Sequence, residues 1–247
     1  MGSNSYYIIF LFVIISCASS DDPGNIVLTN DSLDSLVVMN QIEVDNVIAC
    51  ASASENENEV IIYFYPRVDA TDIRYYETKD VEVDKNNYAN YTKKDLQSED
   101  IFKGYLKKFK RITPKEKWVI ISFKEDGILH LSNPIRLKHR TQNTVFSSEL
   151  TIDEATALMP VFSWEASAIP EDAIYFQVVS DAQDELLSGT YTEESSFQYY
   201  NIANVVLNIT VVTPPSLIPG ADYNFTLMGV SEDNWVNTLI EKPFSVE

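Results

Sequence analysis

Apolar and polar residues alternate in short runs along most of the chain, and the clearest run lies at residues 216–230. The segment SLIPGADYNFTLMGV places Tyr223, Phe225 and Leu227 at every second position, with other side chains facing the opposite way. A period of two is that of a strand with one buried face. The Pro-Gly pair before it predicts a sharp corner that leads into the strand.

The first half contains similar runs separated by turn residues: NVIACASA, EVIIYFYP, IRYYET, KWVIISF and ILHLSNPIRL. Between the last two, Glu125-Asp126-Gly127 predicts a hairpin turn in which the glycine supplies a positive φ. EVIIYFYP is apolar on both faces, so we expect a central strand that is covered on both sides or lines a contact surface. IFKGYLKKFKRI fits a helical stripe, but Gly104 favours a strand or corner. These short strands predict an all-β sandwich.

The second half predicts seven strands, within PVFSWEAS, AIYFQVVS, SGTY, SFQYYNI, NVVLNITVV, residues 216–230 and PFSVE. Proline cannot donate a backbone hydrogen bond, so Pro214, Pro215 and Pro219 predict an edge or loop before the corner. The expected core consists of large apolar side chains: Phe162, Trp164, Phe176, Val178, Leu207, Ile209, Leu217, Tyr223, Phe225, Leu227 and Phe244.

The corner motif L-x-P-G-x-x-Y of fibronectin type III domains is matched by Leu217, Pro219, Gly220 and Tyr223. The resemblance extends over the second half, where Trp164 stands in the place of that family's core tryptophan. It implies that the Tyr223 hydroxyl bonds back to upstream backbone and fixes the corner. The first half resembles an immunoglobulin-like or fibronectin-like fold in its order of elements.

Near the N-terminus, the apolar run YYIIFLFVII is too short to span a bilayer and has the length of a signal-peptide core. The last two residues of this run and the two that follow it, Ile14-Ile15-Ser16-Cys17, resemble the lipobox of bacterial lipoproteins. That resemblance implies acylation of Cys17 and attachment to the outer membrane. The acidic run SSDDPGN after the cysteine resembles the surface-display signal of some Gram-negative lipoproteins, which implies exposure at the cell surface. The alternative is an ordinary secretory signal cleaved after Ala18, which four Asn-x-Ser/Thr sequons would suit.

Charge is distributed unevenly over the 247 residues, whose formal net charge is -19. Residues 43–140 hold 17 basic and 17 acidic residues, whereas residues 147–247 hold one lysine and 16 acidic residues. Binding nucleic acid needs a basic face, so this balance argues against such a partner. The shift predicts two domains after the leader, in this order: signal peptide 1–16, acidic tether 17–35, first β-sandwich 36–146 and second β-sandwich 147–247.

Candidate chemistry is sparse. The two histidines, His130 and His139, have no metal-ligand spacing, and we expect no metal, no cofactor and no catalytic residues. Asp181, Asp184 and Glu185, or Glu232, Asp233 and Asn234, are weaker candidates for a calcium loop. The basic stretch 103–117 is either a solvated face or a site for an anionic polymer. Cys50 is expected to be a buried thiol.

Aromatic side chains are the preferred candidates for ligand contact. Trp235 lies in the polar segment SEDNWVNT, where a ring can stack on a sugar or enter a partner's pocket; the alternative is that it folds over the end of the sandwich. Tyr75, Tyr76, Tyr88 and Tyr91 form a second group with the same two interpretations.

The sequence therefore predicts a lipid-anchored, non-catalytic surface protein of two tandem β-sandwiches that binds a glycan or protein ligand. The alternatives are a structural adhesion or assembly component without a small-molecule site, and a hydrolase with carboxylates on its loops.

Overall fold

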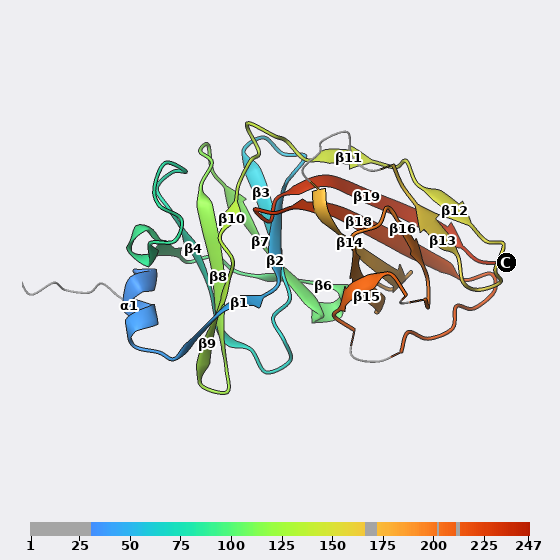
Figure 1. The fold of residues 1–247 in the computed structure, drawn as a ribbon, viewed down its shortest axis with the longest axis horizontal. Coiled ribbons are helices and arrows are strands. Elements are labelled where there is room, and N and C mark those ends of the chain that lie inside the picture. The colour runs from blue at the N-terminus through green and yellow to red at the C-terminus, as the bar shows by residue number, and fades with distance from the viewer. Residues whose placement is uncertain (1–30, 166–171, 202, 211–212) are drawn as a thin grey trace, which may run out of the picture.

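The computed structural model describes residues 31–165, 172–201, 203–210 and 213–247. Cys17 and the predicted leader lie outside these ranges. Two sets of β-sheets follow one another along the long axis, and the C-terminus lies at the end away from the short helix α1 (Figure 1). This arrangement confirms the all-β prediction with β-sandwich domains.

The first module, from α1 to β10, pairs its strands in two sheets, ordered β1-β9-β8-β4-β5 with β10 on β8, and β2-β3-β7-β6. Its strands are β1 (Ile42–Val47), β2 (Ala49–Ala53), β3 (Glu59–Phe64), β4 (Thr71–Glu77), β5 (Thr92–Lys94), β6 (Glu99–Ile101), β7 (Leu106–Ile112), β8 (Trp118–Glu125), β9 (Ile128–Ser132) and β10 (Ile135–Arg136). Two 3₁₀ turns, η1 (Tyr88–Asn90) and η2 (Phe102–Gly104), interrupt them. The ambiguous IFKGYLKKFKRI segment is thus the corner η2 followed by strand β7.

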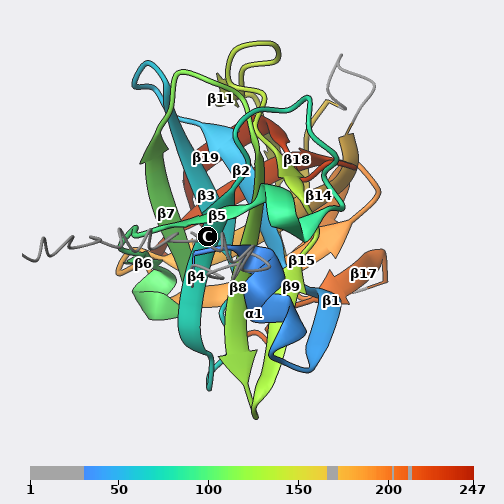
Figure 2. The same cartoon turned by 90° about the vertical axis from the view of Figure 1, so that its left-hand side faces the viewer.

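Helix α1 (Leu33–Val38) corrects the expectation of a featureless tether through residue 35. The helix lies against the outer face of the sheet that contains β8 and β9 (Figure 2), and Leu33 and Leu36 are buried in one cluster with Ile120 and Leu131. The helix has only six residues, too few for a periodic pattern to reveal it. Tertiary packing on the sheet is what stabilises it.

The second module also contains two sheets, ordered β11-β19-β18-β14-β15-β17 and β12-β13-β16. Its strands are β11 (Val145–Ser147), β12 (Thr151–Asp153), β13 (Val161–Ser163), β14 (Asp172–Asp181), β15 (Leu186–Thr192), β16 (Ser196–Gln198), β17 (Val205–Asn208), β18 (Asp222–Ser231) and β19 (Val236–Ser245). The short strands β11 and β12 were not among those expected from the sequence.

The predicted tyrosine corner is present. The backbone N–H of Ile218 donates to the Tyr223 hydroxyl over 2.8 Å, and Gly220 has φ +76°. Trp164 and Tyr223 belong to one buried cluster between the two sheets, and Trp164 lies edge-on to Tyr175 with ring centroids 5.2 Å apart. The hairpin predicted at residues 125–127 also forms between β8 and β9, with Gly127 at φ +81°.

Part of the predicted second core lies elsewhere. Leu207 is 44% exposed on the edge strand β17, so its placement in the core was wrong. Phe176 and Val178 are buried, but they face the first module, while Tyr175 and Val179 on the opposite face of β14 fill the sandwich. Both faces of β14 are apolar, so alternation alone could not say which one is internal.

Candidate functional site

The aromatic residues predicted to contact a ligand are mostly buried. Trp235, Tyr76 and Tyr91 are 0% exposed and Tyr75 is 1% exposed, whereas Tyr88 is half-buried in η1. Of the two interpretations, a ring covered by the fold therefore holds for these four residues, and their rings are not available to a ligand at the surface. Their spacing in polar segments gave no sign that neighbouring strands and α1 cover them.

Trp235 lies in the turn between β18 and β19 but belongs to the core of the first module. Its ring packs in the buried cluster that includes Val60, Phe64 and Ile121. Its Nε1 donates to the carbonyl of Gln142 over 2.8 Å, so the buried indole N–H is satisfied. A residue of the second module thus completes the hydrophobic core of the first.

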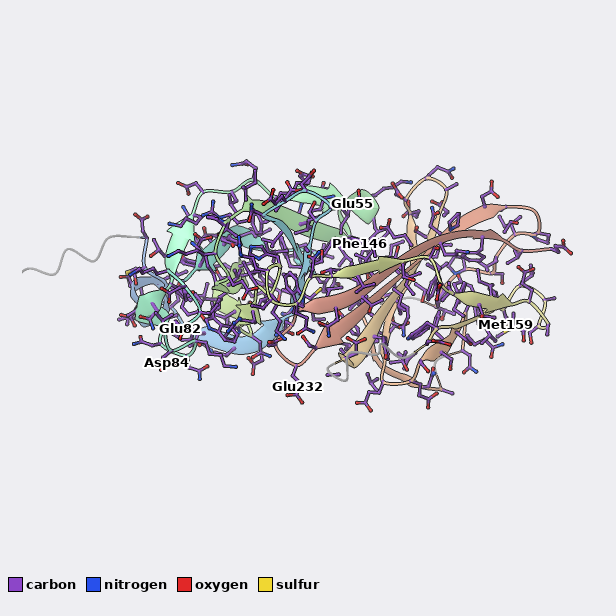
Figure 3. All side chains as sticks on the ribbon, turned by 90° about the horizontal axis from the view of Figure 1, so that it is seen from above. Glu55, Glu82, Asp84, Phe146, Met159 and Glu232 are labelled. Carbon is purple, nitrogen blue, oxygen red and sulfur yellow. The ribbon has the colours of Figure 1, made fainter. Side chains whose placement is uncertain are left out.

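Further hydrogen bonds join the two modules around this tryptophan. The Thr144 hydroxyl accepts from the Ala53 N–H and donates to the Val236 carbonyl, both over 2.8 Å, and the Ala51 N–H donates to the Asn234 carbonyl over 3.0 Å. We call this part of the contact between modules the closed side. Seen from above, Glu55, Phe146 and Glu232 lie along the contact, while Met159 marks the far end of the second module (Figure 3).

The contact between modules continues as an apolar layer beneath the large sheet of the second module. Phe176, Val178, Met228 and Leu239 are buried in one cluster with Leu106 of the first module. Cys50 joins that cluster as a free buried thiol, as expected, and burial raises the pKa of its thiol to about 12.

On the same sheet face, the rows of side chains become polar as they run away from the closed side. Phe176 pairs with Met228 and Met228 with Leu239; two residues along, Val178 pairs with Thr226 and Thr226 with Glu241. The next row is Ser180, Asn224 and Pro243. The two modules are not packed together there, and a cleft of about 890 Å³ remains.

Both modules line this cleft. The first contributes Tyr63 and Lys108, which are paired across β3 and β7, together with residues 100–103. The second contributes the polar rows on β14, β18 and β19 and the turn at residues 183–184. Burial, with a smaller contribution from Glu241, raises the pKa of Tyr63 to about 12, so its hydroxyl is a neutral hydrogen-bonding group at physiological pH.

The rim of the cleft carries unusual backbone. Phe102, Lys103 and Gly104 have φ of +48°, +52° and +87°. For the two residues with a Cβ, a left-handed conformation costs on the order of 1–3 kcal/mol each, and such positions gather at ligand-binding segments. Only glycine adopts the third angle freely. This geometry presents Phe102 to the cleft.

The basic stretch is neutralised by nearby acids. Lys103 pairs with Glu185 and Lys110 with Glu99, each at 2.9 Å, and Lys107 pairs with Asp100. Arg111 pairs with the buried Glu77 at 2.8 Å. These contacts favour the solvated-face interpretation over a site for an anionic polymer.

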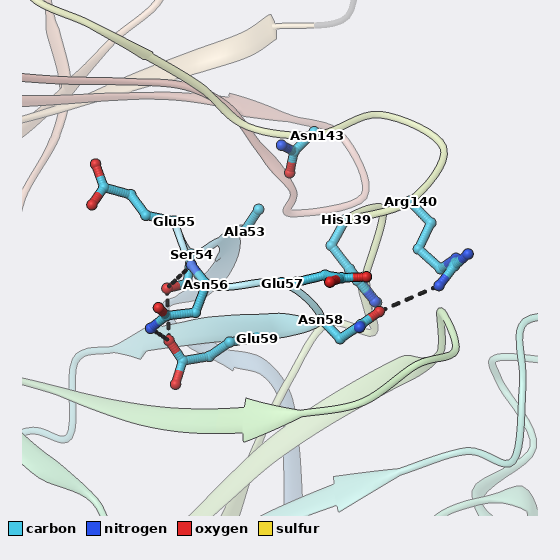
Figure 4. A pocket seen from close by; sticks show the side chains of 10 residues that line it. All are labelled: Ala53, Ser54, Glu55, Asn56, Glu57, Asn58, Glu59, His139, Arg140 and Asn143. Carbon is cyan, nitrogen blue, oxygen red and sulfur yellow. Dashed lines mark hydrogen bonds between the residues drawn. The ribbon is translucent and has the colours of Figure 1, made fainter.

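A smaller hollow of about 350 Å³ lies over the β2–β3 turn (Figure 4). The Glu59 carboxylate accepts from Ser54 and Asn56 at its base, and Arg140 donates to Asn58 over 3.3 Å at one side. It is smaller than the cleft, and Glu55, Glu57 and Asn143 complete its polar lining.

Among the described residues, no group of three or more His, Cys, Asp or Glu side chains has a metal-binding arrangement. The Asp181 carboxylate, a calcium candidate, accepts from the Gln183 and Glu185 N–H groups over 2.9 and 2.8 Å and so closes its own turn. Asp233, the other main candidate, pairs with Lys138 at 2.9 Å. In the same part of the chain, we find no helix with the length and apolar character needed to cross a bilayer.

Fold and site together define an all-β protein of two joined sandwiches with a ligand-sized cleft between them. No protein-family model matches the chain, and neither does any curated protein. Among solved structures, it is similar to a two-domain fibronectin type III segment of chicken tenascin, with 12% identity and a TM-score of 0.31 over 81% of this chain and 98% of that one.

A glycoside hydrolase domain of Endo-D from Streptococcus pneumoniae R6 is similar at 10% identity and a TM-score of 0.31, over 81% of this chain and 33% of that one. At these scores neither likeness bears on function.

Proposed function

We propose that this chain is an exported, lipid-anchored accessory protein of the cell surface that binds a glycan or protein ligand without catalysis. The cleft of about 890 Å³ is the observation that carries the binding part of the proposal. Its volume lies within the range of small-ligand sites, and two separate modules supply its walls. The closed side fixes the walls relative to each other, which lowers the ordering cost of binding.

The binding proposal is tested with the full chain against immobilised glycans and peptides. Glu241 lines the cleft and is exposed, so its truncation leaves the packed cores intact. It is therefore the side chain to change. We expect Glu241→Ala to weaken the binding of any ligand that occupies the cleft. Binding that is unaffected by changes throughout the cleft would place the site elsewhere and contradict the proposal.

The anchor rests on the lipobox-like sequence that ends at Cys17. An acylated N-terminal cysteine would hold the protein at the membrane, since each buried methylene contributes about 0.8 kcal/mol. Metabolic labelling with a palmitate analogue should mark the protein and Cys17→Ala should abolish the label. A secreted, unlabelled protein cleaved after Ala18 would support the alternative leader.

The structural alternative has one observation in its favour. Edge strand β17 exposes Val206 by 54% and Leu207 by 44%. Unpaired edges with apolar side chains are templates for strand pairing between molecules. Concentration-dependent assembly, measured by analytical ultracentrifugation and lost in Val206→Lys, would favour an assembly component over a ligand-binding protein.

A further inference from the structure

The side chains around the cleft belong to a particular chemical type. Five of them end in a planar carboxylate or carboxamide: Asp100, Gln183, Asp184, Asn224 and Glu241. Each such group offers two polar atoms side by side, and the carboxylates only accept while the amides both donate and accept. Adjacent hydroxyl groups on a ring are well matched to this geometry, because one planar group can bond to both.

Apolar surface lies directly beside these polar groups. Ile101, Phe102 and Met228 line the same cleft, and Met228 is followed on its strand face by Thr226 and Asn224. A ligand with a polar edge and a C–H face fits this arrangement, since each of its surfaces then meets a matching one. Sugar rings have both surfaces.

The charge of the lining is balanced. Three carboxylates and three lysines border the cleft, and Lys103 is already paired with Glu185 at 2.9 Å. A polyanion would need an excess of unpaired cations to displace its counterions, and a cationic peptide would need an excess of carboxylates. Neither excess is present, so the lining favours an uncharged ligand.

The shape also distinguishes between ligand classes. A stable protein partner buries roughly 800 Å² on each side over a mostly flat surface, whereas a small ligand is enclosed by a concave one. The cleft is concave, and its lining residues come from opposing sheets. A short, narrow molecule can touch both modules at once.

We propose that the cleft binds a short neutral oligosaccharide, with its hydroxyl groups on Asn224, Glu241 and Asp184 and a sugar face against Phe102. The ligand class deepens the proposed function and rests on it. Binding would require both modules, because the phenyl ring comes from the first and Asn224 and Glu241 come from the second.

The test uses the full chain on an array of neutral di- to tetrasaccharides that also carries sulfated and uronic-acid saccharides and a peptide library. We expect retention of neutral saccharides that persists in high salt, since uncharged ligands release no counterions. For the best saccharide, Glu241→Ala should raise Kd about tenfold or more, the range for hydrogen bonds to a charged group, and Asn224→Ala about two- to tenfold, the range for a neutral group. The matched control Glu193→Ala, exposed in a turn away from the cleft, should leave Kd unchanged.

One further variant distinguishes a ligand that binds through its hydroxyl groups from a cationic ligand. Glu241→Gln keeps a planar hydrogen-bonding group and removes its charge, so a neutral saccharide should lose clearly less affinity than with Glu241→Ala. A cationic ligand would lose as much affinity with Gln as with Ala. Circular dichroism of each variant verifies folding before binding is measured.

Three other outcomes would contradict the oligosaccharide inference. Peptides that bind at the cleft while saccharides do not would overturn the oligosaccharide but leave the proposed binding function standing. Retention of only sulfated or uronic-acid saccharides, lost in salt, would also overturn it. If neither glycans nor peptides are retained, both the inference and the binding function fail.

Discussion

Strands β18 and β19 contribute to both sides of the contact between modules, but the modules are packed together on only one of these sides. On the closed side, the β18–β19 turn enters the first module, and Trp235 is 0% exposed. On the other side, the same strands present Thr226 and Asn224 to a cleft of about 890 Å³. Along this face, Met228 is buried in the apolar layer between the modules, whereas Thr226 and Asn224 line the cleft.

The difference also explains how a cleft can persist in a small protein. Open concave surfaces collapse unless something else fixes their walls, because dispersion contacts favour closer packing. Here the buried tryptophan and the hydrogen bonds of Thr144 fix the walls from the closed side. The cleft side is then free to carry polar groups that do not stabilise the fold.

The largest expected effect comes from breaking the closed side. Trp235→Ala should reduce the free energy of unfolding by about 3–5 kcal/mol, the cost of removing a fully buried aromatic side chain and leaving a cavity. It should also separate one cooperative urea transition into two, because the modules would lose their shared core. The control Phe146→Ala removes a ring that is 44% exposed and should change the free energy by less than about 1 kcal/mol. Equal small losses in both variants would mean that the turn does not join the modules.

The first module contains a second kind of buried contact for comparison with Trp235: an ion pair, with no aromatic side chain, that links its two sheets. Glu77 on β4 is 2% exposed and accepts from Arg111 on β7 over 2.8 and 2.9 Å and from Lys117 over 2.6 Å. Removing one partner of a buried ion pair leaves the others uncompensated. Glu77→Ala should therefore cost about 3 kcal/mol at pH 7, measured by urea unfolding.

The pH dependence of that loss has a definite sign. Burial opposes ionisation of Glu77, but hydrogen bonds from Arg111 and Lys117 outweigh it and hold the pKa of the carboxyl below its ordinary 4.5. Stability from a depressed carboxyl pKa is present above pH 4.5 and is lost as the pH falls through the folded value. The difference between wild type and Glu77→Ala should shrink in that window; a difference that stays constant down to low pH would contradict the assignment.

The parts of the fold that were predictable from sequence are those with a local signal. Tyr223 follows Pro219 and Gly220 at the spacing of the corner, and its hydroxyl bond at 2.8 Å has the geometry that the motif implies. Gly127 follows Asp126 in a hairpin turn that needs a positive φ. The corner and the hairpin turn each depend on residues only a few positions apart, so the local sequence is sufficient to predict them.

The site was not predictable in this way. The polar segment SEDNWVNT left both a ligand contact and a covered ring open for Trp235, because its environment consists of strands about 100 or more residues earlier in the chain. Asn224 and Thr226 looked like an ordinary solvent face of β18. The available signal was the change along that face from polar Asn224 and Thr226 to apolar Met228 and Val230, which indicates a surface that is covered at one end only.

A smaller effect is expected at the start of β14, near the closed side. Burial raises the pKa of Asp172 above its ordinary 3.8, although Asn237 donates to its Oδ1 over 2.8 Å. A raised carboxyl pKa contributes stability that is present below pH 3.8 and lost as the pH rises through the folded value. Asp172→Asn should therefore stabilise the protein slightly at pH 7 and lose that advantage near pH 3.5. Urea unfolding at the two pH values checks this, and a gain that is the same at both would show that the charge is not the cause.

The smallest effect is expected at the rim of the cleft, where Lys103 and Glu185 join the modules by an ion pair of 2.9 Å. Their side chains are 52% and 57% exposed, so water and salt screen the attraction and ordering two long side chains opposes it. Lys103→Ala and Glu185→Ala should each leave the urea midpoint unchanged within error, in contrast to Trp235→Ala. A clear shift in either variant, larger at low salt, would mean that charge across the cleft holds the modules together and that the two sides are less different than their packing indicates.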